Sequence, residues 1–491
     1  MPDQSHSIVP GHKPGDVTIR RRRIKRHRLR RVLGVPALFS AGYGNVGSSI
    51  YYALGIVAAA AMGATPVALG VAGIFFVSAA LAYAEGTAMF PEAGGSSSFA
   101  RHGFNELVSF ISGWALMLSY VVTISISAFT IPPYLAFFWA PLKESETVGT
   151  AVAMGLVLLL MIINVVGVKE TAFVNVLASI LDLTTQGLLV ITGLFFLFNF
   201  PLLITHVFEF WPRPENLLFG IAIASLAYTG VETVSQMAEE TRQPEKSVPK
   251  ALVLMTITVL AMFSLISITA LSAMPPSELA TTWSKDPMAG IASSLPVEVL
   301  RVVLQPMVAV LAATILLIAT NAGLMGISRL GFSMALHRHI PRRFGQIDAR
   351  SKVPIFSIMV FATIALLILV PGLFGSGIYG DLGALYVFGS LLALGLAQAS
   401  IVALRINKPE LPRPFKVPWS IRWRGKEIPW FTVLGTIFML GVWAVLLFLQ
   451  PYSRWVGLGW MSFGLILYVL YRRRAGLSLT KEAPKLEIMS G

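Results

Sequence analysis

The sequence predicts an all-α integral membrane protein with twelve transmembrane helices. Hydrophobic residues make up 55% of the 491 residues and charged residues only 13%, which is about half the charged share of a soluble domain. Twelve stretches are long and apolar enough to cross the roughly 30 Å hydrocarbon core of a bilayer, a distance that takes about 20 helical residues. A soluble fold could not cover so much apolar surface, whereas lipid can solvate it.

The twelve stretches follow one another along most of the chain. Their predicted limits are 34–61, 66–90, 104–138, 149–167, 173–199, 215–240, 249–273, 298–335, 354–371, 380–404, 429–449 and 453–472. The third and eighth stretches are long enough to tilt in the bilayer or to protrude from it.

Basic residues predict the orientation of these helices. If the N-terminus is cytoplasmic, the outer loops hold only five of the 38 Lys and Arg residues. Those five are Lys143, Arg213, Lys285, Arg301 and Arg454. Because cytoplasmic loops are enriched in Lys and Arg, both termini are predicted to lie on the cytoplasmic side of a cell membrane.

The same pattern predicts how the chain is divided. A basic cytoplasmic tail, 1–33, holds nine Lys and Arg residues between Arg20 and Arg31, and this favours contact with anionic lipid over nucleic acid. A helical core over 34–404 comes next. It is followed by a basic cytoplasmic loop over 405–428, helices eleven and twelve over 429–472, and a cytoplasmic tail over 473–491.

Several kinds of chemistry are not expected from this sequence. It has no cysteine, which excludes disulfides and thiol nucleophiles. His337 and His339 lie among arginines in a predicted loop, where solvated side chains are expected rather than a metal site. No Walker motif is present. We therefore expect no enzyme, no metal and no cofactor.

Three acidic residues fall well inside predicted spans, and these are Glu85, Asp182 and Glu232. A charge at the bilayer centre costs about 2.5–3.5 kcal/mol on insertion scales, so such residues usually face a bundle interior or a water-filled path. Glu85 lies near the inner end of its span, and we expect it to be a structural partner of a loop arginine. Glu232 is expected either to tune a hinge in its span or to cap a half-helix there.

Asp182 shares a helix face with other polar residues. Asn175, Ser179, Asp182 and Gln186 are spaced to lie on one side of the fifth span. A carboxyl group shielded from water can bind and release a proton near neutral pH. Asp182 is therefore predicted to be a coupling site for a proton or another cation.

Two spans carry signs of an interruption near mid-membrane. The first has three glycines and an asparagine within 41–50, and the sixth has Tyr228, Gly230 and Glu232 within 227–233. Interrupted segments at matching positions point to a transporter site, because freed backbone groups must line a cavity. The alternative is that the glycines only allow close helix packing.

Four motifs resemble those of the amino acid–polyamine–organocation permeases. Residues 238–251 (AEETRQPEKSVPKA) resemble the segment after helix six, and 91–95 (PEAGG) the loop after helix two. Residues 321–341, which include Asn321, Ser328 and Arg329, are similar to helix eight and its loop, and 413–418 (RPFKVP) to the loop after helix ten.

The resemblance implies a five-plus-five inverted repeat over 34–199 and 215–404, broken helices one and six, two additional C-terminal helices, and transport by alternating access. It places a substrate carboxylate at the helix-one break, on Val46, Gly47, Ser48 and Ser49. It places the substrate amine at the helix-six break, on Ala227, Tyr228, Thr229 and Gly230. Ser49 stands where the family usually has glycine, and Asp182 where many relatives have lysine.

A second resemblance, to the potassium–proton symporters of the same superfamily, rests on Tyr43, Gly44, Tyr120, Thr123 and 229–232. Pro36 stands where those symporters place an acid, which weakens a potassium assignment.

The sequence therefore predicts a secondary transporter of an amino acid or related amine, coupled to protons. A potassium–proton symporter and a non-transporting membrane sensor remain as alternatives. The tails are too short for the output domain that a sensor needs.

Overall fold

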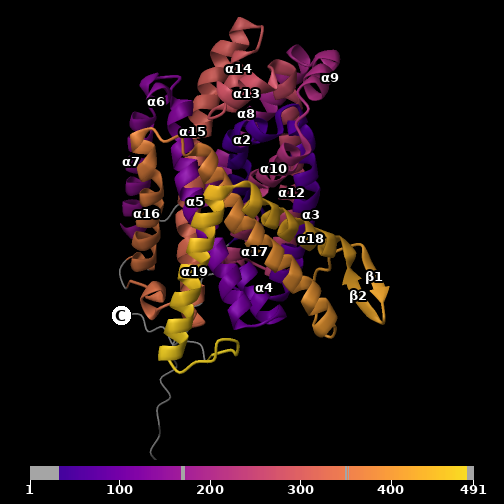
Figure 1. Cartoon of the computed structure of the whole chain (residues 1–491), viewed down its shortest axis with the longest axis vertical. Coiled ribbons are helices and arrows are strands. Elements are labelled where there is room, and N and C mark those ends of the chain that lie inside the picture. The colour runs from indigo at the N-terminus through magenta and orange to yellow at the C-terminus, as the bar shows by residue number, and fades with distance from the viewer. Residues whose placement is uncertain (1–32, 167–171, 349–350, 352, 484–491) are drawn as a thin grey trace, which may run out of the picture.

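The computed structural model describes residues 33–166, 172–348, 351 and 353–483. In this part of the chain helices form a bundle, with a single β-hairpin at its edge (Figure 1). The predicted all-helical class is confirmed. The cluster between Arg20 and Arg31 lies outside the described residues.

Eleven helical stretches among the described residues are long and apolar enough to cross a membrane. The first, Val35–Met89, is 55 residues long and joins the first two predicted spans. A straight helix of that length would measure about 80 Å, far more than a bilayer core. The backbone leaves the helical region at Met62, where φ is 47° and ψ is −123°.

The helices of these stretches match most of the predicted limits to within a few residues. They are α1 (Val35–Val46), α2 (Ile50–Ala61), α3 (Thr65–Met89), α5 (Glu106–Leu135), α7 (Glu146–Val166), α8 (Ala172–Phe196), α10 (Pro214–Ala224), α11 (Glu232–Gln236), α12 (Pro244–Ala273), α15 (Glu298–Leu336), α16 (Ile355–Leu369), α17 (Tyr379–Asn407), α18 (Trp430–Leu449) and α19 (Pro451–Arg474).

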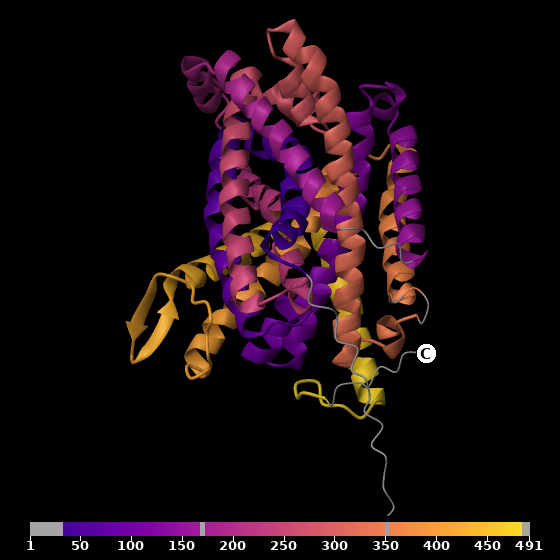
Figure 2. The same cartoon turned by 180° about the vertical axis from the view of Figure 1, so that it is seen from behind.

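Short elements cover the two ends of the bundle. α6 (Pro141–Glu144), α9 (Phe200–Glu209), α13 (Pro276–Thr281) and α14 (Pro287–Ser293) lie at the upper end in Figure 1, and α4 (Ser96–Gly103) at the lower end. The hairpin of β1 (Ser420–Trp423) and β2 (Lys426–Pro429) projects sideways near the lower end, as the reverse view in Figure 2 also shows.

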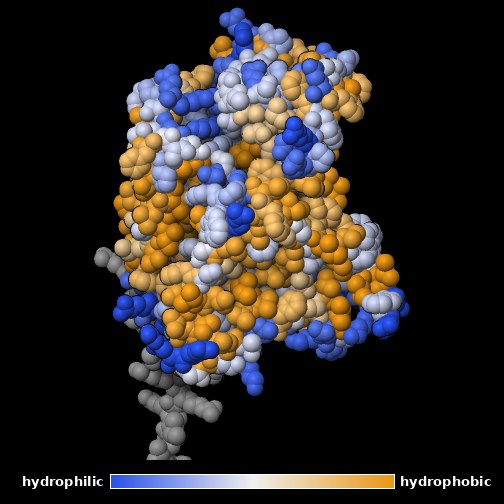
Figure 3. All heavy atoms as spheres, in the orientation of Figure 1, coloured by the Kyte–Doolittle hydropathy of each residue, from blue (hydrophilic) through white to orange (hydrophobic). Residues whose placement is uncertain are grey.

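Helix α5 is the centre of the bundle, and α18 and α19 are its periphery. In the most apolar 18-residue segment of each helix, 83% of the residues are buried in α5 but only 22% in α18 and in α19. The exposed side chains of the outer helices are large and apolar. Figure 3 shows hydrophobic residues over most of the middle of the molecule, with hydrophilic residues gathered toward its ends. This distribution is that of a multi-pass membrane protein.

The carboxylate of Glu85 on α3 has the arginine partners that the sequence predicts. Arg405, at the end of α17, donates to both of its oxygens from Nε at 2.7 Å and from Nη2. Arg413 in the following loop lies 3.5 Å away, and the Val417 amide donates at 2.7 Å. These contacts fasten the 413–418 motif to the end of α3.

Replacing Glu85 by glutamine is expected to destabilise the protein by about 2–4 kcal/mol, because the buried Arg405 would keep only the more exposed Glu427, 3.6 Å away, as a charged partner. Thermal unfolding of the purified protein in detergent measures this effect. The double variant Glu85→Gln/Arg405→Met should recover much of the loss. A single variant that unfolds at the wild-type temperature would contradict the assignment.

The expectation that His337 and His339 are solvated is wrong. Their side chains are 4% and 1% exposed, because the chain after α15 turns back under α5 and α19. His339 pairs with Glu106, and burial lowers the pKa of His337 to about 3, so that its ring is neutral at pH 7.

Candidate functional site

The sixth predicted span comprises α10 and α11 and is called helix six below, just as α1 and α2 together are called helix one. Helix six is interrupted in its middle. Helix α10 tightens into a 3-10 turn over Ser225–Tyr228, and Thr229 is then extended, with φ −79° and ψ 148°. Gly230 follows at φ +120°, a conformation that side chains rarely adopt. Helix α11 resumes at Glu232. This interruption leaves backbone groups without helical partners in the interior of the bundle.

The interruption in the first predicted span takes a different form from the one expected. Residues Gly47–Ser49 form a 3-10 turn between α1 and α2, and the backbone stays in the right-handed helical region throughout. The glycine is needed for packing, since a Cβ on Gly47 would lie 2.6 Å from the Tyr43 ring. At Gly42 a Cβ would lie 2.6 Å from Val234 on α11. Close packing therefore explains two of the three glycines.

The two interruptions lie against each other. A Cβ on Gly230 would be 2.8 Å from Asn45 Nδ2 and 3.1 Å from Val46. Asn45 Nδ2 donates to Thr233 Oγ1 at 2.8 Å, which joins the end of α1 to α11. The Asn45 Oδ1 atom is buried and has no hydrogen-bond partner in the described part of the chain.

The residues predicted to receive a carboxylate make local hydrogen bonds at this junction. Ser48 Oγ donates to the Asn45 carbonyl at 2.9 Å, and Ser49 Oγ lies 2.9 Å from Tyr52 Oη. Gly44 packs toward Ile318 of α15.

The helix-six residues that were predicted to receive the substrate amine point in two directions. Thr229 bonds to the Leu226 carbonyl at 2.9 Å and stays at the interruption, and Ala227 is fully buried. Tyr228 points away from it, toward α3. There its hydroxyl donates to the Leu69 carbonyl at 2.9 Å, and its ring stacks on Phe76.

Tyrosine hydroxyls without hydrogen-bond partners surround the helix-six interruption. Those of Tyr83 on α3, Tyr120 on α5 and Tyr386 on α17 are buried, and none has a partner among the described residues. The Tyr83 hydroxyl faces Ser96, and that of Tyr120 faces Thr233. The Tyr386 hydroxyl faces Thr123 and Thr229. Polar groups that lack partners in a protein interior are costly, which is typical of a site that completes its hydrogen bonds with a ligand.

Asp182 is buried at a second polar centre, between α8 and helix one. Its carboxylate accepts hydrogen bonds from Tyr43 Oη at 2.8 Å, Tyr51 Oη at 2.6 Å and Gln186 Nε2 at 2.8 Å. All three donors are neutral. The Tyr43 hydroxyl is therefore directed to Asp182 and not to the helix-six interruption. The Tyr51 carbonyl accepts from Tyr134 Oη at 2.8 Å, which connects this centre to α5.

Glu232 accepts a backbone hydrogen bond at the start of the second half of helix six. Its Oε2 accepts the Gly230 amide at 3.1 Å, so it satisfies a backbone donor that the interruption leaves free. The side chain is 1% exposed.

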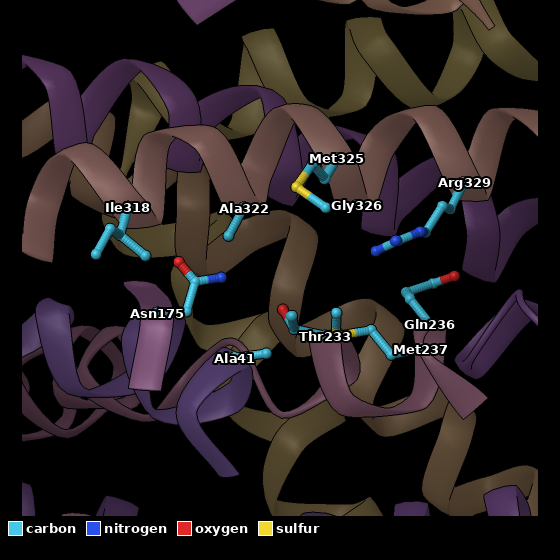
Figure 4. A pocket seen from close by; sticks show the side chains of 10 residues that line it. All are labelled: Ala41, Asn175, Thr233, Gln236, Met237, Ile318, Ala322, Met325, Gly326 and Arg329. Carbon is cyan, nitrogen blue, oxygen red and sulfur yellow. The ribbon is translucent and has the colours of Figure 1, made fainter. Parts of the chain in front are cut away.

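A small cavity lies between α1, α8, α11 and α15, next to the Asn45–Thr233 contact (Figure 4). Its volume is about 30 Å³, which is room for a single water molecule. Its lining comprises Ala41, Asn175, Thr233, Gln236, Met237, Ile318, Ala322, Met325, Gly326 and Arg329. An amino acid needs a far larger pocket, so this cavity is too small to hold one in the conformation described.

Contacts between the 91–95 loop, the segment after helix six and α15 close the lower end of the bundle. Arg329 pairs with Glu240 at 2.8 Å. The amides of Ala93 and Gly94 donate to Glu239 and Gln236 at 3.1 and 3.0 Å. The loop that holds Ala93 is itself fixed by Glu92. Burial opposes the charge of Glu92, but the hydrogen bond from His102 and the charge of Arg101 keep its pKa below the usual range.

The upper end is closed by a separate set of contacts. Lys143 Nζ lies 2.7 Å from Asp286 Oδ1, and Lys285 lies 3.4 Å from Glu146. The site is therefore covered at both ends.

The sequence did not single out Tyr51, Tyr83 or Tyr386, and it used Asn45 only as a sign of the interruption in the first span. A usable signal was present, since tyrosines inside apolar spans need partners for their hydroxyls.

Comparison with known proteins identifies the family. The family model described as amino acid permease matches residues 33–471. The chain belongs to the amino acid permease family. The predicted relationship to the amino acid–polyamine–organocation permeases is thereby confirmed.

Three relatives from Bacillus subtilis show how wide the family is. The chain is 26% identical to the branched-chain amino acid permease BcaP over 469 residues, which cover 91% of this chain and 94% of the relative. It is 24% identical to a methylthioribose transporter, covering 91% of this chain and 95% of the relative. It is also 26% identical to the glutamate/serine transporter AimA, covering 83% of this chain and 75% of the relative.

Proposed function

We propose that this permease is a secondary active transporter that moves an amino acid or a related amine across the cell membrane by alternating access, coupled to protons. The observation that carries the proposal is the junction of Gly230 with Asn45 and Val46. There the only extended part of helix six lies against the turn of helix one. Half-helix ends and free backbone groups can hold a zwitterion.

The substrate class follows from the groups at this junction. The hydroxyls of Ser48 and Ser49 at the helix-one turn would receive the carboxylate. The carbonyls of 227–230 and the unpartnered tyrosine hydroxyls would receive the amine. The names of the relatives include branched-chain amino acids, glutamate and serine, so the family's substrates differ in their side chains.

We assign proton coupling to Asp182. Its three hydrogen-bond donors are neutral, and two of them, Tyr43 and Tyr51, belong to helix one on either side of the turn. A change in the protonation of Asp182 would therefore act on both halves of helix one.

The proposed topology has twelve spans in a five-plus-five inverted repeat with both termini in the cytoplasm. The break at Met62 supports counting Val35–Met89 as two spans. The basic loops that follow α15 and α17 support placing the lower end of Figure 1 in the cytoplasm. The basic N-terminal tail would then contact anionic lipid.

Uptake into proteoliposomes with an alkaline interior tests the function. One arm offers a mixture of labelled amino acids and the other offers rubidium as a potassium surrogate. We expect accumulation of amino acids that a protonophore abolishes. Accumulation of rubidium alone would contradict the proposal. It would indicate a potassium site formed by Tyr43, Tyr120, Thr123 and Thr229.

Replacing Glu232 by glutamine separates hinge tuning from capping. The amide can still accept the Gly230 N–H but carries no charge. If Glu232 tunes the hinge, we expect the pH profile of uptake to shift by about one unit or to flatten. Glu239→Gln is the matched control, because its carboxylate also accepts a backbone amide but lies outside the interruption. An unchanged pH profile and affinity would leave capping as the whole role of Glu232.

A further inference from the structure

A groove opens on the outside of the bundle where α12 meets the loop after α17. Its volume is about 490 Å³, which is in the range of ligand pockets. One wall is a single face of α12, and the other is formed by Pro414 and Phe415 of the 413–418 motif. The transport site does not use these residues.

The lower part of the groove is positively charged. Lys246 and Lys250 lie one helical turn apart on α12, and both are exposed. Neither ammonium group has an ion-pair partner in the described part of the chain. Glu245 also lines the groove, and the lysines outnumber it. Two free ammonium groups on one helix face can bind a phosphate from two sides.

The upper part of the groove is apolar. Val253, Leu254 and Ile257 continue the same face of α12 toward mid-membrane, and they are 37%, 50% and 62% exposed. They belong to Pro244–Ala273, one of the stretches that could span a membrane. A ligand in this groove would therefore meet charge at one end and a hydrocarbon surface at the other.

The neighbouring β-hairpin adds further exposed apolar and basic side chains. Trp419, Ile421 and Trp423 are 59%, 57% and 62% exposed. Arg424 lies over the Trp423 ring, 5.1 Å from its centroid, and Arg422 is exposed beside it. Exposed tryptophans with arginines are typical of the membrane–water interface.

We infer that the groove is a binding site for an anionic phospholipid of the cytoplasmic leaflet. Lys246 and Lys250 hold the phosphate and headgroup, while Leu254, Ile257 and Phe415 contact an acyl chain. Basic pockets beside transmembrane helices on the cytoplasmic side bind acidic lipid headgroups in this way. The hairpin lies in the adjacent headgroup layer. Because Glu85 fixes this loop to α3, the bound lipid would contact both α12 and the anchored end of α17.

Native mass spectrometry of the full-length protein tests this inference. The protein is released from nanodiscs of equal parts phosphatidylglycerol and phosphatidylcholine, and the retained lipid is measured at rising collision energy. We expect phosphatidylglycerol to be retained at least fivefold more than phosphatidylcholine. The double variant Lys246→Gln/Lys250→Gln should lose this preference. Size-exclusion chromatography checks that the variant remains folded.

The matched control is Arg342→Gln/Arg343→Gln, which removes the same charge from exposed positions near the end of α15, outside the groove. It should retain phosphatidylglycerol as the wild type does. Equal loss in both double variants, or no preference in the wild type, would overturn the proposed site. Retention of soluble glycerol phosphate equal to that of the long-chain lipid would also overturn it, since the site would then bind an anion and not a lipid. The measurement requires no transport, so it stands apart from the proposed function.

Discussion

An Asp182→Asn variant is expected to bind and exchange substrate but to lose gradient-driven accumulation. A pH gradient contributes about 1.4 kcal/mol per unit for each proton moved, which is a tenfold accumulation ratio. With a gradient of one unit, the wild type should approach tenfold accumulation and the variant should stay near equality. Asparagine keeps the size of the side chain and can accept a hydrogen bond from Tyr43 or Tyr51, but it cannot carry a proton.

Two assays on the same proteoliposomes separate coupling from folding. Counterflow measures exchange, which needs no net proton movement, and it should stay within about twofold of wild type. Thr185→Val is the matched control, since Thr185 is also a buried polar residue on α8 and bonds only to its own helix, at the Leu181 carbonyl. Undiminished accumulation by Asp182→Asn would refute the coupling role.

A Gly230→Ala variant is expected to lose at least tenfold in transport rate and about 2–4 kcal/mol in stability. The φ of +120° is strained for any residue with a Cβ, at a cost on the order of 1–3 kcal/mol. The added methyl group would also lie 2.8 Å from Asn45 Nδ2. Helices one and six would therefore be forced apart at the proposed site.

Gly187→Ala on α8 is the control for this prediction. A Cβ there meets no atom within 4 Å, and alanine favours a helix. The variant should transport and unfold like the wild type. Normal transport by Gly230→Ala would show that the close approach of helices one and six is dispensable.

The membrane class and the helix limits could be predicted because they depend on local composition. An apolar run about 20 residues long has one physical interpretation in a chain with so little charge. The short helices α13 and α14 were not predicted, since they lie in polar connections where hydropathy carries no signal. The first two spans merge into one helical stretch because only the backbone at Met62 separates them.

The candidate site was predicted less completely. Gly230 and Glu232 stood out because glycine and acid are unusual inside an apolar span. The form of the helix-one turn depends on the Tyr43 ring that packs against Gly47, and no sequence pattern reveals that contact. Gln186 lies one turn from Asp182 on the face that the sequence predicts, but Tyr43 and Tyr51 come to Asp182 from a separate part of the chain, so their pairing depends on how helices meet.

Protection of a single cysteine from chemical labelling tests the central claim that the substrate binds at the junction of helices one and six. The natural chain has no cysteine, so a Thr229→Cys variant carries a single thiol. Its rate of reaction with a small methanethiosulfonate is measured in membranes, with and without the amino acids accumulated in the uptake assay. Ser277→Cys, at an exposed position on α13, is the control. We expect substrate to slow labelling at Thr229→Cys at least fivefold and to leave Ser277→Cys unchanged. Equal labelling rates at Thr229→Cys with and without substrate would contradict the account.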